Sequence, residues 1–304
     1  MNFSDLTTLR IGGPIKEVVS VETEEELINS LQGAVAKKIP YLVIGGGSNL
    51  LVSDAGFEGL VIKNELKGAH DLGNNVMVKS GETLQSLVDF ANEQGLRGLE
   101  SLAGIPGTVG GAIYGNAGAY GQTISDNLSQ VSVFDVKDQV RKTLVREECG
   151  FYYRDSLFKK NGNIILEATF VLTPGDSIQL KETSFETISK REVKYPPGIK
   201  CPGSFFKNII ANQLPPGILA KIPVDKVVYG KVPAGTLLEM VGARGDSLRE
   251  IEIAPYHANL FINRGGGKAS DFHLLANKYF DKVKESFGIE LQPEVQLINL
   301  PAIK

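Results

Sequence analysis

The chain has 304 residues, of which 42% are hydrophobic and 22% charged, and its formal net charge is −3 at pH 7. A chain of this length can form two or three domains with buried cores. Lys and Arg are spread along the sequence and form no basic stripe, which argues against nucleic acid as a partner.

The two cysteines and the N-terminal residues indicate a cellular compartment. Cys149 and Cys201 fit neither a disulfide framework nor a zinc-binding spacing, so we expect free thiols in a reducing environment. The first residues lack a basic segment followed by an apolar run, and no stretch is long and apolar enough to span a bilayer. We therefore expect a cytoplasmic protein with no membrane partner.

The first elements in chain order are short strands with one helix between them. β-branched apolar runs predict strands over 17–21, 40–44 and 59–63. A capping box, in which Thr23 and Glu26 satisfy backbone donors reciprocally, predicts a helix start, and apolar residues follow at helical spacing.

Two glycine clusters, over 44–51 and 104–112, are the most informative motifs. Glycine permits positive φ and lacks the Cβ that would keep a ligand away from the backbone. Free amides in such turns form a concave anion site. Two loops of this kind predict a diphosphate held at two points, as in a dinucleotide. Residues 50–56 do not have a helical pattern, which separates the first loop from a Rossmann fingerprint.

The middle of the chain continues as a mixture of strands and helix. Apolar runs predict strands over 76–79, 131–136 and 164–172. An apolar stripe from Leu84 to Ala91 predicts a helix that ends at Gly95.

The last part begins after a predicted linker helix. That helix covers about 184–193 and ends before Pro196 and Pro197, since proline cannot continue a helix. A long helix with a C-terminal cap at Gly288 follows. Its expected apolar face consists of Phe272, Leu275, Tyr279, Val283 and Phe287. The whole pattern is α+β in three pieces.

Two familiar site types are excluded. Residues 265–268 resemble a P-loop, but Ala269 and Ile262 stand where Ser or Thr and a glycine are required. The histidines, His70, His257 and His273, are too scattered to suggest a metal site. We therefore predict no bound metal.

A family resemblance rests on six motifs in a fixed order. They are Thr8–Pro14, Gly45–Leu51, Gly104–Ala112, Tyr153–Ser156, Gly203–Asn208 and Gln292–Val295. Together they resemble the UDP-N-acetylenolpyruvoylglucosamine reductases, also called UDP-N-acetylmuramate dehydrogenases, over nearly the whole chain. The resemblance implies an FAD-binding fold of the vanillyl-alcohol-oxidase (PCMH) type in two subdomains, 1–65 and 66–180. A C-terminal α+β substrate-binding domain, 181–304, would follow.

The resemblance also implies an activity, the reduction of UDP-N-acetylglucosamine enolpyruvate to UDP-N-acetylmuramate in peptidoglycan precursor synthesis. NADPH would reduce a noncovalent FAD, which then gives hydride to C3 of the substrate. Residues 44–60 contain no His or Cys to tether the flavin. The partners would be small molecules and we expect a monomer, while the sequence leaves NADPH and NADH open as the reductant.

The family's site residues carry over position by position. The implied FAD-binding residues are Gly45, Gly46, Gly47, Ser48, Asn49, Gly104, Gly107, Thr108, Gly110 and Gly111. Arg154 would bind the substrate carboxylate, since a guanidinium suits a developing dianion by charge and by its forked hydrogen bonds. Ser204 would donate the proton to C2, and Glu294 would lie near the substrate carboxylate. Weaker substrate-binding candidates are Asn49, Lys207 and Asn208.

Each of the three catalytic candidates also has a plain structural interpretation. Arg154 alone would more often form an ion pair with Asp155, Ser204 would be a turn residue, and Glu294 would be a surface residue. The chain departs from the family in Pro202, which precedes the Gly203-Ser204 pair. It also lacks the long, tyrosine-bearing excursion of one subtype, which indicates the shorter subtype.

Two other functions remain open at this point. The first is another noncovalent flavin oxidoreductase of the same fold, such as an oxidase, which would react rapidly with oxygen. The second is a non-catalytic nucleotide-binding module. Such a module would have no need of Arg154, Ser204 and Glu294 in matched contexts.

Overall fold

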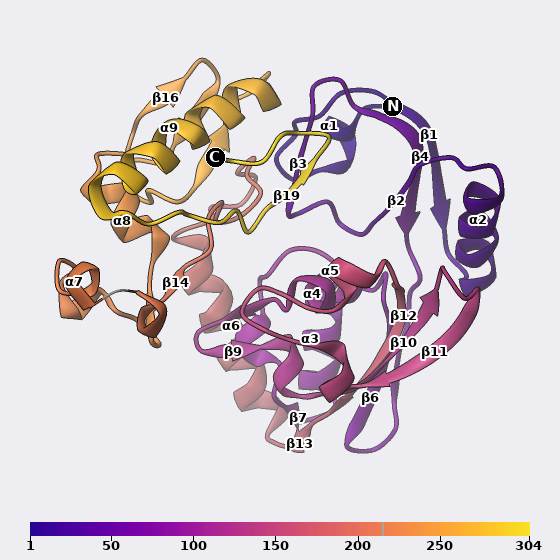
Figure 1. Ribbon diagram of the computed structural model, residues 1–304. Coiled ribbons are helices and arrows are strands. Elements are labelled where there is room, and N and C mark those ends of the chain that lie inside the picture. Colours follow the sequence, from indigo (N-terminus) through magenta and orange to yellow (C-terminus); the bar gives the residue numbers. More distant parts are fainter. Residues whose placement is uncertain (215) are drawn as a thin grey trace. The chain divides into compact units, whose positions relative to one another are not determined.

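The computed structural model (Figure 1) describes residues 1–214 and 216–304 and divides into two compact units. The sheet unit comprises residues 16–46 and 58–193. The C-terminal unit comprises residues 1–15, 47–57 and 194–304.

The sheet unit contains a small sheet covered by one helix. The sheet has the strand order β1-β4-β2, and β2 and β4 are parallel. The elements are β1 (Ile15–Val21), α2 (Glu24–Ala36), β2 (Tyr41–Ile44) and β4 (Phe57–Asn64). The predicted capping box at the start of α2 is present, with the Glu26 amide donating to Thr23 Oγ1 over 3.2 Å. The strand predictions over 17–21, 40–44 and 59–63 are confirmed.

A larger antiparallel sheet, in the order β11-β10-β12-β6-β5, forms the rest of the framework of this unit. Its strands are β5 (Ala69–Asp71), β6 (Asn75–Lys79), β10 (Leu128–Asp135), β11 (Val140–Val145) and β12 (Ile164–Val171). Helix α3 (Leu84–Glu93) buries Leu84, Leu87, Val88 and Ala91 in the core with this sheet, as the apolar stripe predicts. Gly95 follows its C-terminus with a φ of +66°.

Shorter elements complete the sheet unit. They are α4 (Val109–Gly115), α5 (Phe158–Asn161), the hairpin β8 (Gly118–Ala119) and β9 (Gln122–Thr123), and the pair β7 (Leu96–Arg97) and β13 (Thr173–Pro174). Turns of 3-10 helix cover Glu100–Leu102, Ile124–Asp126 and Arg146–Cys149. The chain passes from β12 to α6 over residues 172–176, in line with the short connection expected there.

The predicted linker helix over 184–193 needs correction. Helix α6 spans Ser177–Glu192 and begins seven residues earlier because the Asp176 carboxylate accepts the Gln179 amide over 2.9 Å. It belongs to the sheet unit, where buried Asn92 donates from Nδ2 to Ser184 Oγ over 2.8 Å. Polar contacts of this kind leave no apolar periodicity to reveal the start of the helix or its packing against α3.

The C-terminal unit is built around the long helix α9 (Ala269–Phe287), which ends at Gly288 with a φ of +68°. Its other elements are α1 (Phe3–Leu6), β3 (Leu50–Val52), β14 (Ile209–Ile210), α7 (Pro216–Leu219), β15 (Lys231–Val232), α8 (Ala234–Met240), β16 (Ser247–Leu248), β17 (Ile251–Ile253), β18 (Phe261–Asn263) and β19 (Gln296–Ile298). Turns of 3-10 helix cover Ala211–Gln213 and Val224–Lys226. The core contains Phe205, Phe206, Phe261 and Phe272, all fully buried.

The compact units differ from the predicted division at 1–65, 66–180 and 181–304. β3 pairs in parallel with β19, which joins residues 47–57 to the C-terminal unit. In the sheet unit, Leu27 and Leu31 of α2 share a core with Phe134 and Leu166 of the larger sheet. The division into three domains stays a prediction. The compact units combine segments that are distant in sequence, because the contacts within each unit are long-range.

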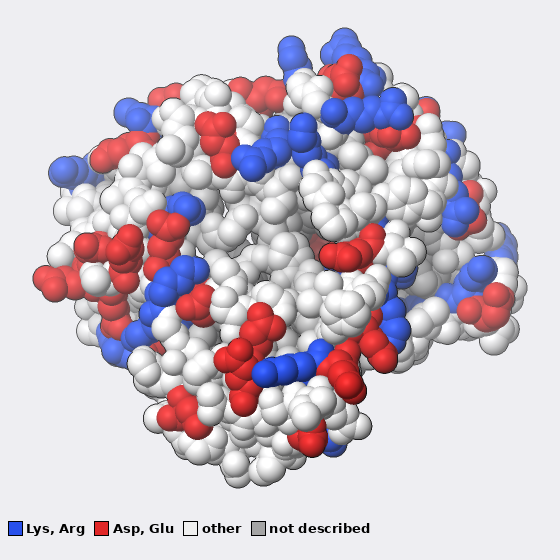
Figure 2. Space-filling model, turned by 180° about the vertical axis from the view of Figure 1, so that it is seen from behind, with Lys and Arg blue, Asp and Glu red and all other residues white. Residues whose placement is uncertain are grey.

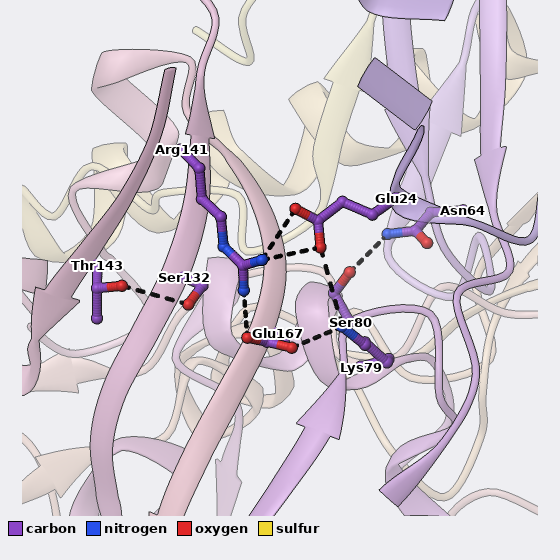
Figure 3. A network of polar contacts seen from close by, with 8 residues as sticks. All are labelled: Glu24, Asn64, Lys79, Ser80, Ser132, Arg141, Thr143 and Glu167. Carbon is purple, nitrogen blue, oxygen red and sulfur yellow. Dashed lines mark hydrogen bonds and ion pairs between the residues drawn. The ribbon is translucent and has the colours of Figure 1, made fainter. Parts of the chain in front are cut away.

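A network of ion pairs joins α2 to the larger sheet within the sheet unit (Figure 3). Arg141 bridges Glu24, at 3.2 Å from Nη1 to Oε1, and Glu167. Lys79 Nζ lies 2.6 Å from Glu167 Oε2 and 3.9 Å from Glu24 Oε2. Burial opposes ionisation of Glu167, but Lys79 and Arg141 outweigh it and hold the pKa of this carboxyl below its ordinary value.

The charged side chains on the surface are mixed, as the composition predicts. On the face that Figure 2 shows, Lys and Arg side chains lie among Asp and Glu side chains. This mixture follows from 32 basic and 35 acidic residues and differs from the basic stripe of a nucleic-acid-binding protein. Among the residues that the structure describes, no helix combines the length and the apolar composition needed to cross a membrane.

We expect Glu167→Gln to lower the free energy of unfolding by about 1 kcal/mol at pH 7, since Arg141 and Lys79 keep only Glu24 as a partner and are themselves partly exposed. The pKa of Glu167 is lowered by folding, so its contribution is present above the unfolded value of about 4.3. It is lost as pH falls through the lower folded value. Urea unfolding at pH 7 and pH 3 measures this: the difference from the parent protein should shrink at pH 3.

The control for this prediction is Glu186→Gln, because Glu186 forms an exposed i,i+4 pair with Lys190 on α6. It should change the free energy of unfolding by less than about 0.5 kcal/mol. Equal effects of the two substitutions at pH 7 would contradict a stabilising role for the network.

Candidate functional site

The predicted site residues fall into two groups, one in each compact unit. The sheet unit holds Gly45, Gly46, Gly104, Gly107, Thr108, Gly110, Gly111 and Arg154. The C-terminal unit holds Gly47, Ser48, Asn49, Ser204, Lys207, Asn208 and Glu294. The structure brings residues together within each group.

In the sheet unit, the two glycine loops pack directly against each other. A Cβ at Gly45 would lie 2.2 Å from Thr108 Oγ1, and a Cβ at Gly46 would lie 3.0 Å from Gly107 Cα. Contacts this close leave no space for a side chain on the first loop. The sequence places these loops about sixty residues apart, and the fold makes them neighbours.

The second loop leads into α4, whose N-cap is Thr108. The Gly111 amide donates to Thr108 Oγ1 over 3.3 Å, and the Gly110 amide donates to Ser80 O over 2.8 Å. A Cβ at Gly110 would lie 2.9 Å from Ser80 Cβ, so this glycine is required by the packing of α4 on the loop after β6. In the described part of the chain, the amides of Gly46 and Gly107 donate to no protein acceptor.

These loops fit the diphosphate expected from the sequence. Backbone amides that are not used by the protein, beside a helix N-terminus, are the donors that bind phosphate groups. The fit rests on the neighbouring amides of Gly46 and Gly107 and on the absence of side chains between them.

Arg154 has a strained backbone and a fixed side chain. Its φ is +53°, a left-handed value that a non-glycine residue rarely adopts and that is often found at functional sites. Arg154 Nη2 donates to Gly118 O over 2.7 Å and Nη1 to Asn116 O over 3.4 Å. The guanidinium carbon also lies 5.3 Å from the centre of the Tyr153 ring.

Asp155, the partner that a plain surface interpretation would give Arg154, has another cation beside it. Asp155 pairs with Lys160, at 3.0 Å between Oδ2 and Nζ. Burial opposes ionisation of Asp155, but Lys160 outweighs it and holds the pKa of this carboxyl below its ordinary value. Arg154 contacts backbone carbonyls at and after the C-terminus of α4, which places a cation at that end of the helix.

In the C-terminal unit, Ser204 lies on a segment that is hydrogen-bonded along both edges. On one edge, buried Asn259 accepts the Phe205 amide through its main-chain oxygen and the Phe206 amide through Oδ1, over 3.0 and 2.9 Å. Asn259 Nδ2 returns a bond to Phe206 O over 2.8 Å. The two phenylalanines are fully buried, while Ser204 is half-buried.

Glu294 lies on the other edge of the same segment. The Glu294 amide donates to Phe205 O over 2.7 Å, and the Lys207 amide donates to Gln292 O over 2.8 Å. These bonds make the backbones of Ser204 and Glu294 neighbours, although ninety residues separate them in sequence. A hydroxyl and a carboxyl group are thereby supplied by adjacent backbone segments.

Asn49 connects the first glycine loop to Glu294. Its Nδ2 donates to Glu294 O over 3.1 Å, and its main-chain oxygen accepts the Gln296 amide over 2.9 Å. β3 then pairs with β19 in parallel. The side chain of Asn49 therefore holds the segment that carries Glu294 and leads into β19.

The two weaker candidates are also located on this segment. Lys207 is half-buried, and its amide is bound by Gln292 O. Asn208 Oδ1 accepts the Ala234 amide over 3.1 Å at the start of α8, so this side-chain oxygen has a structural function.

Polar residues that sequence reasoning missed hold the N-terminal motif in the C-terminal unit. Buried Asn263 donates from Nδ2 to Leu9 O and Arg10 O, and its Oδ1 accepts the amides of Gly265 and Gly267. The amides of the glycine-rich run before α9, residues 265–267, thus bind an asparagine side chain, where the amides of a P-loop would bind a phosphate. Residues 256–263 contain both Asn259 and Asn263, so their high asparagine content next to an apolar strand was the available signal.

Asp54 occupies the N-terminus of α9. Its carboxylate oxygens accept the amides of Ala269 and Ser270 over 2.8 and 3.0 Å. An acidic group at a helix N-terminus is stabilised by the orphan amides and by the helix dipole. The chain itself therefore provides the anion at the site where the sequence resembled a P-loop.

Both cysteines are free thiols and buried. Burial raises the pKa of Cys149 to about 11, and burial also raises the pKa of Cys201. Neither thiol is therefore suited to act as a nucleophile at neutral pH.

Two family models match most of the chain. Residues 15–143 match the family model described as an FAD binding domain, and residues 195–298 match the model described as the C-terminal domain of UDP-N-acetylenolpyruvoylglucosamine reductase. A curated reductase of that name from Solibacter usitatus is 41% identical over 294 residues, covering 96% of this chain and 94% of its own length. One from Geobacillus thermodenitrificans is 35% identical, with 96% and 90% covered.

A solved structure is similar over the same extent. The crystal structure of the UDP-N-acetylenolpyruvylglucosamine reductase from Thermus caldophilus matches with a TM-score of 0.77 and 32% identity. The match covers 98% of this chain and 97% of that chain.

We expect Gly45→Ala to lower the free energy of unfolding by about 1–3 kcal/mol, because the added Cβ would meet Thr108 Oγ1 at 2.2 Å and force the two loops apart. Urea unfolding of the purified variant measures this. The control is Gly33→Ala inside α2, where a Cβ meets nothing within 4 Å. It should stabilise the protein by about 0.5–1 kcal/mol. A Gly45→Ala variant as stable as the parent protein would show that the loops can separate at no cost.

Proposed function

Since the chain belongs to the UDP-N-acetylenolpyruvoylglucosamine reductase family, and is thus an FAD-dependent oxidoreductase of peptidoglycan precursor synthesis, we propose the roles that its residues take in the reaction. The observation that supports these roles best is the paired edge of the segment 203–208, which makes the backbones of Ser204 and Glu294 neighbours.

The two glycine loops would hold the diphosphate of FAD. The residues concerned are Gly45, Gly46, Gly47, Ser48, Asn49, Gly104, Gly107, Thr108, Gly110 and Gly111, of which Gly46 and Gly107 have available amides. The chemistry that FAD supplies when bound is hydride transfer, taken from NADPH and delivered to C3 of the enolpyruvyl group. The protein must then stabilise the negative charge that develops at C2 and provide a proton there.

Arg154 would stabilise that negative charge. Hydride addition at C3 leaves carbanion character at C2, delocalised into the substrate carboxylate. A guanidinium that is oriented in advance by two carbonyls needs little reorganisation when the charge develops. Its planar fork can bind both carboxylate oxygens.

Ser204 would provide the proton to C2, and Glu294 would assist at the substrate carboxylate. A carbanion is a strong base, so the position of the serine hydroxyl matters more than its acidity. That position is set by Asn259 and by the Glu294 amide on the two edges of the segment. Lys207 and Asn208 follow on the same segment and would contribute to substrate binding.

The proposal extends to the substrates, the oligomeric state and the cellular location of the protein. The substrates would be the UDP-sugar enolpyruvyl ether and NADPH, bound by a monomer of the shorter subtype that lacks the tyrosine loop. A cytoplasmic location, which two free thiols favour, belongs to the same proposal.

An anaerobic absorbance titration tests the activity as a whole. NADPH should bleach the flavin band of the purified protein, and UDP-N-acetylglucosamine enolpyruvate should restore it. A flavin that recovers only when air is admitted would indicate an oxidase of the same fold. A protein that binds no FAD would contradict the assignment of both loops.

We expect Ser204→Ala to retain FAD and its reduction by NADPH, but to reoxidise with the enolpyruvyl substrate at least about 100-fold more slowly. Stopped-flow absorbance measures the two half-reactions separately. Ser189→Ala on the exposed face of α6 is the matched control, since its hydroxyl donates to Phe185 O within its own helix. Normal reoxidation of Ser204→Ala would exclude Ser204 as the proton donor.

We expect Arg154→Ala to fail at the same half-reaction by about 100- to 1,000-fold, because the charge at the substrate carboxylate develops only there. FAD content, measured by absorbance after gel filtration, should be unchanged. Arg244→Ala removes an exposed arginine that pairs with Glu239 and serves as the control. A loss of NADPH oxidation by Arg154→Ala, with reoxidation intact, would assign the residue to the other substrate.

A further inference from the structure

A second hydroxyl lies beside Ser204. Tyr195 Oη is 2.9 Å from Ser204 Oγ, within hydrogen-bond distance, and both residues are half-buried in the C-terminal unit. Neither glycine loop, nor Arg154, nor Glu294 accounts for this contact, and the sequence motifs do not include Tyr195.

The tyrosine is held in place from several sides. Its ring packs against a small buried cluster of Cys201, Ala254 and Leu260, and its centre lies 6.2 Å from that of the His257 ring. Pro196 follows directly and disfavours a helical backbone at Tyr195, which restricts the conformations open to this residue. The pair of hydroxyls is therefore part of a packed structure and not a contact between two mobile surface side chains.

The backbone of Ser204 is also fixed by its neighbours. Gly203 precedes it with a φ of +84°, and the backbone of Ser204 bridges that of Leu260, a member of the cluster that supports Tyr195. Both hydroxyls are thus fixed to one small region of the protein, and the distance between them is determined by that region.

The chemistry of the two hydroxyls indicates which one donates the hydrogen bond. A serine hydroxyl has one proton, which it must direct to C2 of the substrate if it is the donor. The oxygen then needs a donor of its own, both to orient it and to stabilise the negative charge that it acquires. A phenol is a much stronger acid than an aliphatic alcohol and can supply that proton.

We propose that Tyr195 is a positioning residue that donates its hydroxyl proton to Ser204 and renews the proton that Ser204 gives to the substrate. This inference rests on the proposed role of Ser204. In the step, the electron pair at C2 forms a C–H bond as the Ser204 O–H bond breaks. Ser204 Oγ takes the proton of Tyr195, and the tyrosine oxygen recovers a proton from water.

The first test is Tyr195→Phe, which removes the hydroxyl and keeps the ring in its cluster. Reoxidation of the reduced flavin by the enolpyruvyl substrate should slow by about 10- to 100-fold. Reduction by NADPH, the KM for the enolpyruvyl substrate, the calorimetric Kd of that substrate for the oxidised enzyme and the thermal midpoint should stay the same. Tyr256→Phe, at an exposed tyrosine of the same unit, is the matched control and should match the parent protein in every measurement.

The second test separates proton transfer from packing. The rate of reoxidation is measured in mixtures of H₂O and D₂O. Two protons in motion predict a curved dependence on the deuterium fraction in the parent protein and a linear one in Tyr195→Phe. Replacing Tyr195 by 3,5-difluorotyrosine, which retains ring and hydroxyl, should restore the curvature and a rate within about threefold of the parent. This replacement also covers the case in which Tyr195→Phe folds poorly.

The outcomes distinguish this inference from the proposed function. If Ser204→Ala reoxidises normally, the assignment of the donor fails and the relay fails with it. If Ser204→Ala is blocked while Tyr195→Phe reoxidises within about twofold of the parent, only the relay is overturned. Linear dependences in both the parent protein and Tyr195→Phe would likewise overturn it.

Discussion

The C-terminal unit depends on one hydrogen-bonded segment, residues 203–208, which has a partner on each edge. Asn259 binds it on one side through backbone and side chain, and the Glu294 amide binds it on the other. Because Phe205 and Phe206 are buried together, the segment cannot shift along either neighbour without exposing an aromatic ring. This fixes the register, and with it the proximity of Ser204 and Glu294. The proposed chemistry uses groups whose positions are set by backbone bonds of this kind.

In the sheet unit, the main constraint is the close approach of the two glycine loops. Gly45 lies against the side chain of Thr108 and Gly46 lies against the backbone of Gly107, so neither glycine of the first loop has room for a Cβ. In the same unit, the network of Glu24, Arg141, Glu167 and Lys79 and a shared core join α2 to the larger sheet (Figure 3).

Local sequence signals predicted much of this. The capping box of α2 and the apolar faces of α3 and α9 are repeated patterns within one element, and each was found where expected. The start of α6 was missed because Asp176 and a polar first turn determine it. The Tyr195–Ser204 contact could not be seen, since it depends on how a loop folds back onto a cluster. The order of six motifs identified the family, but their positions in space depend on pairings between distant segments.

The pairing of β3 with β19, together with the cap that Asp54 places on α9, links early and late parts of the chain. Residues 1–15 and 47–57 are synthesised well before their partners, which are Asn263, the first turn of α9 and residues 296–298. During synthesis on the ribosome, these early segments stay unpaired with their apolar residues exposed. Most of the sheet unit, residues 58–193, is made before their partners appear. Contacts of such long sequence separation form slowly, so we expect the C-terminal unit to complete its folding after the sheet unit.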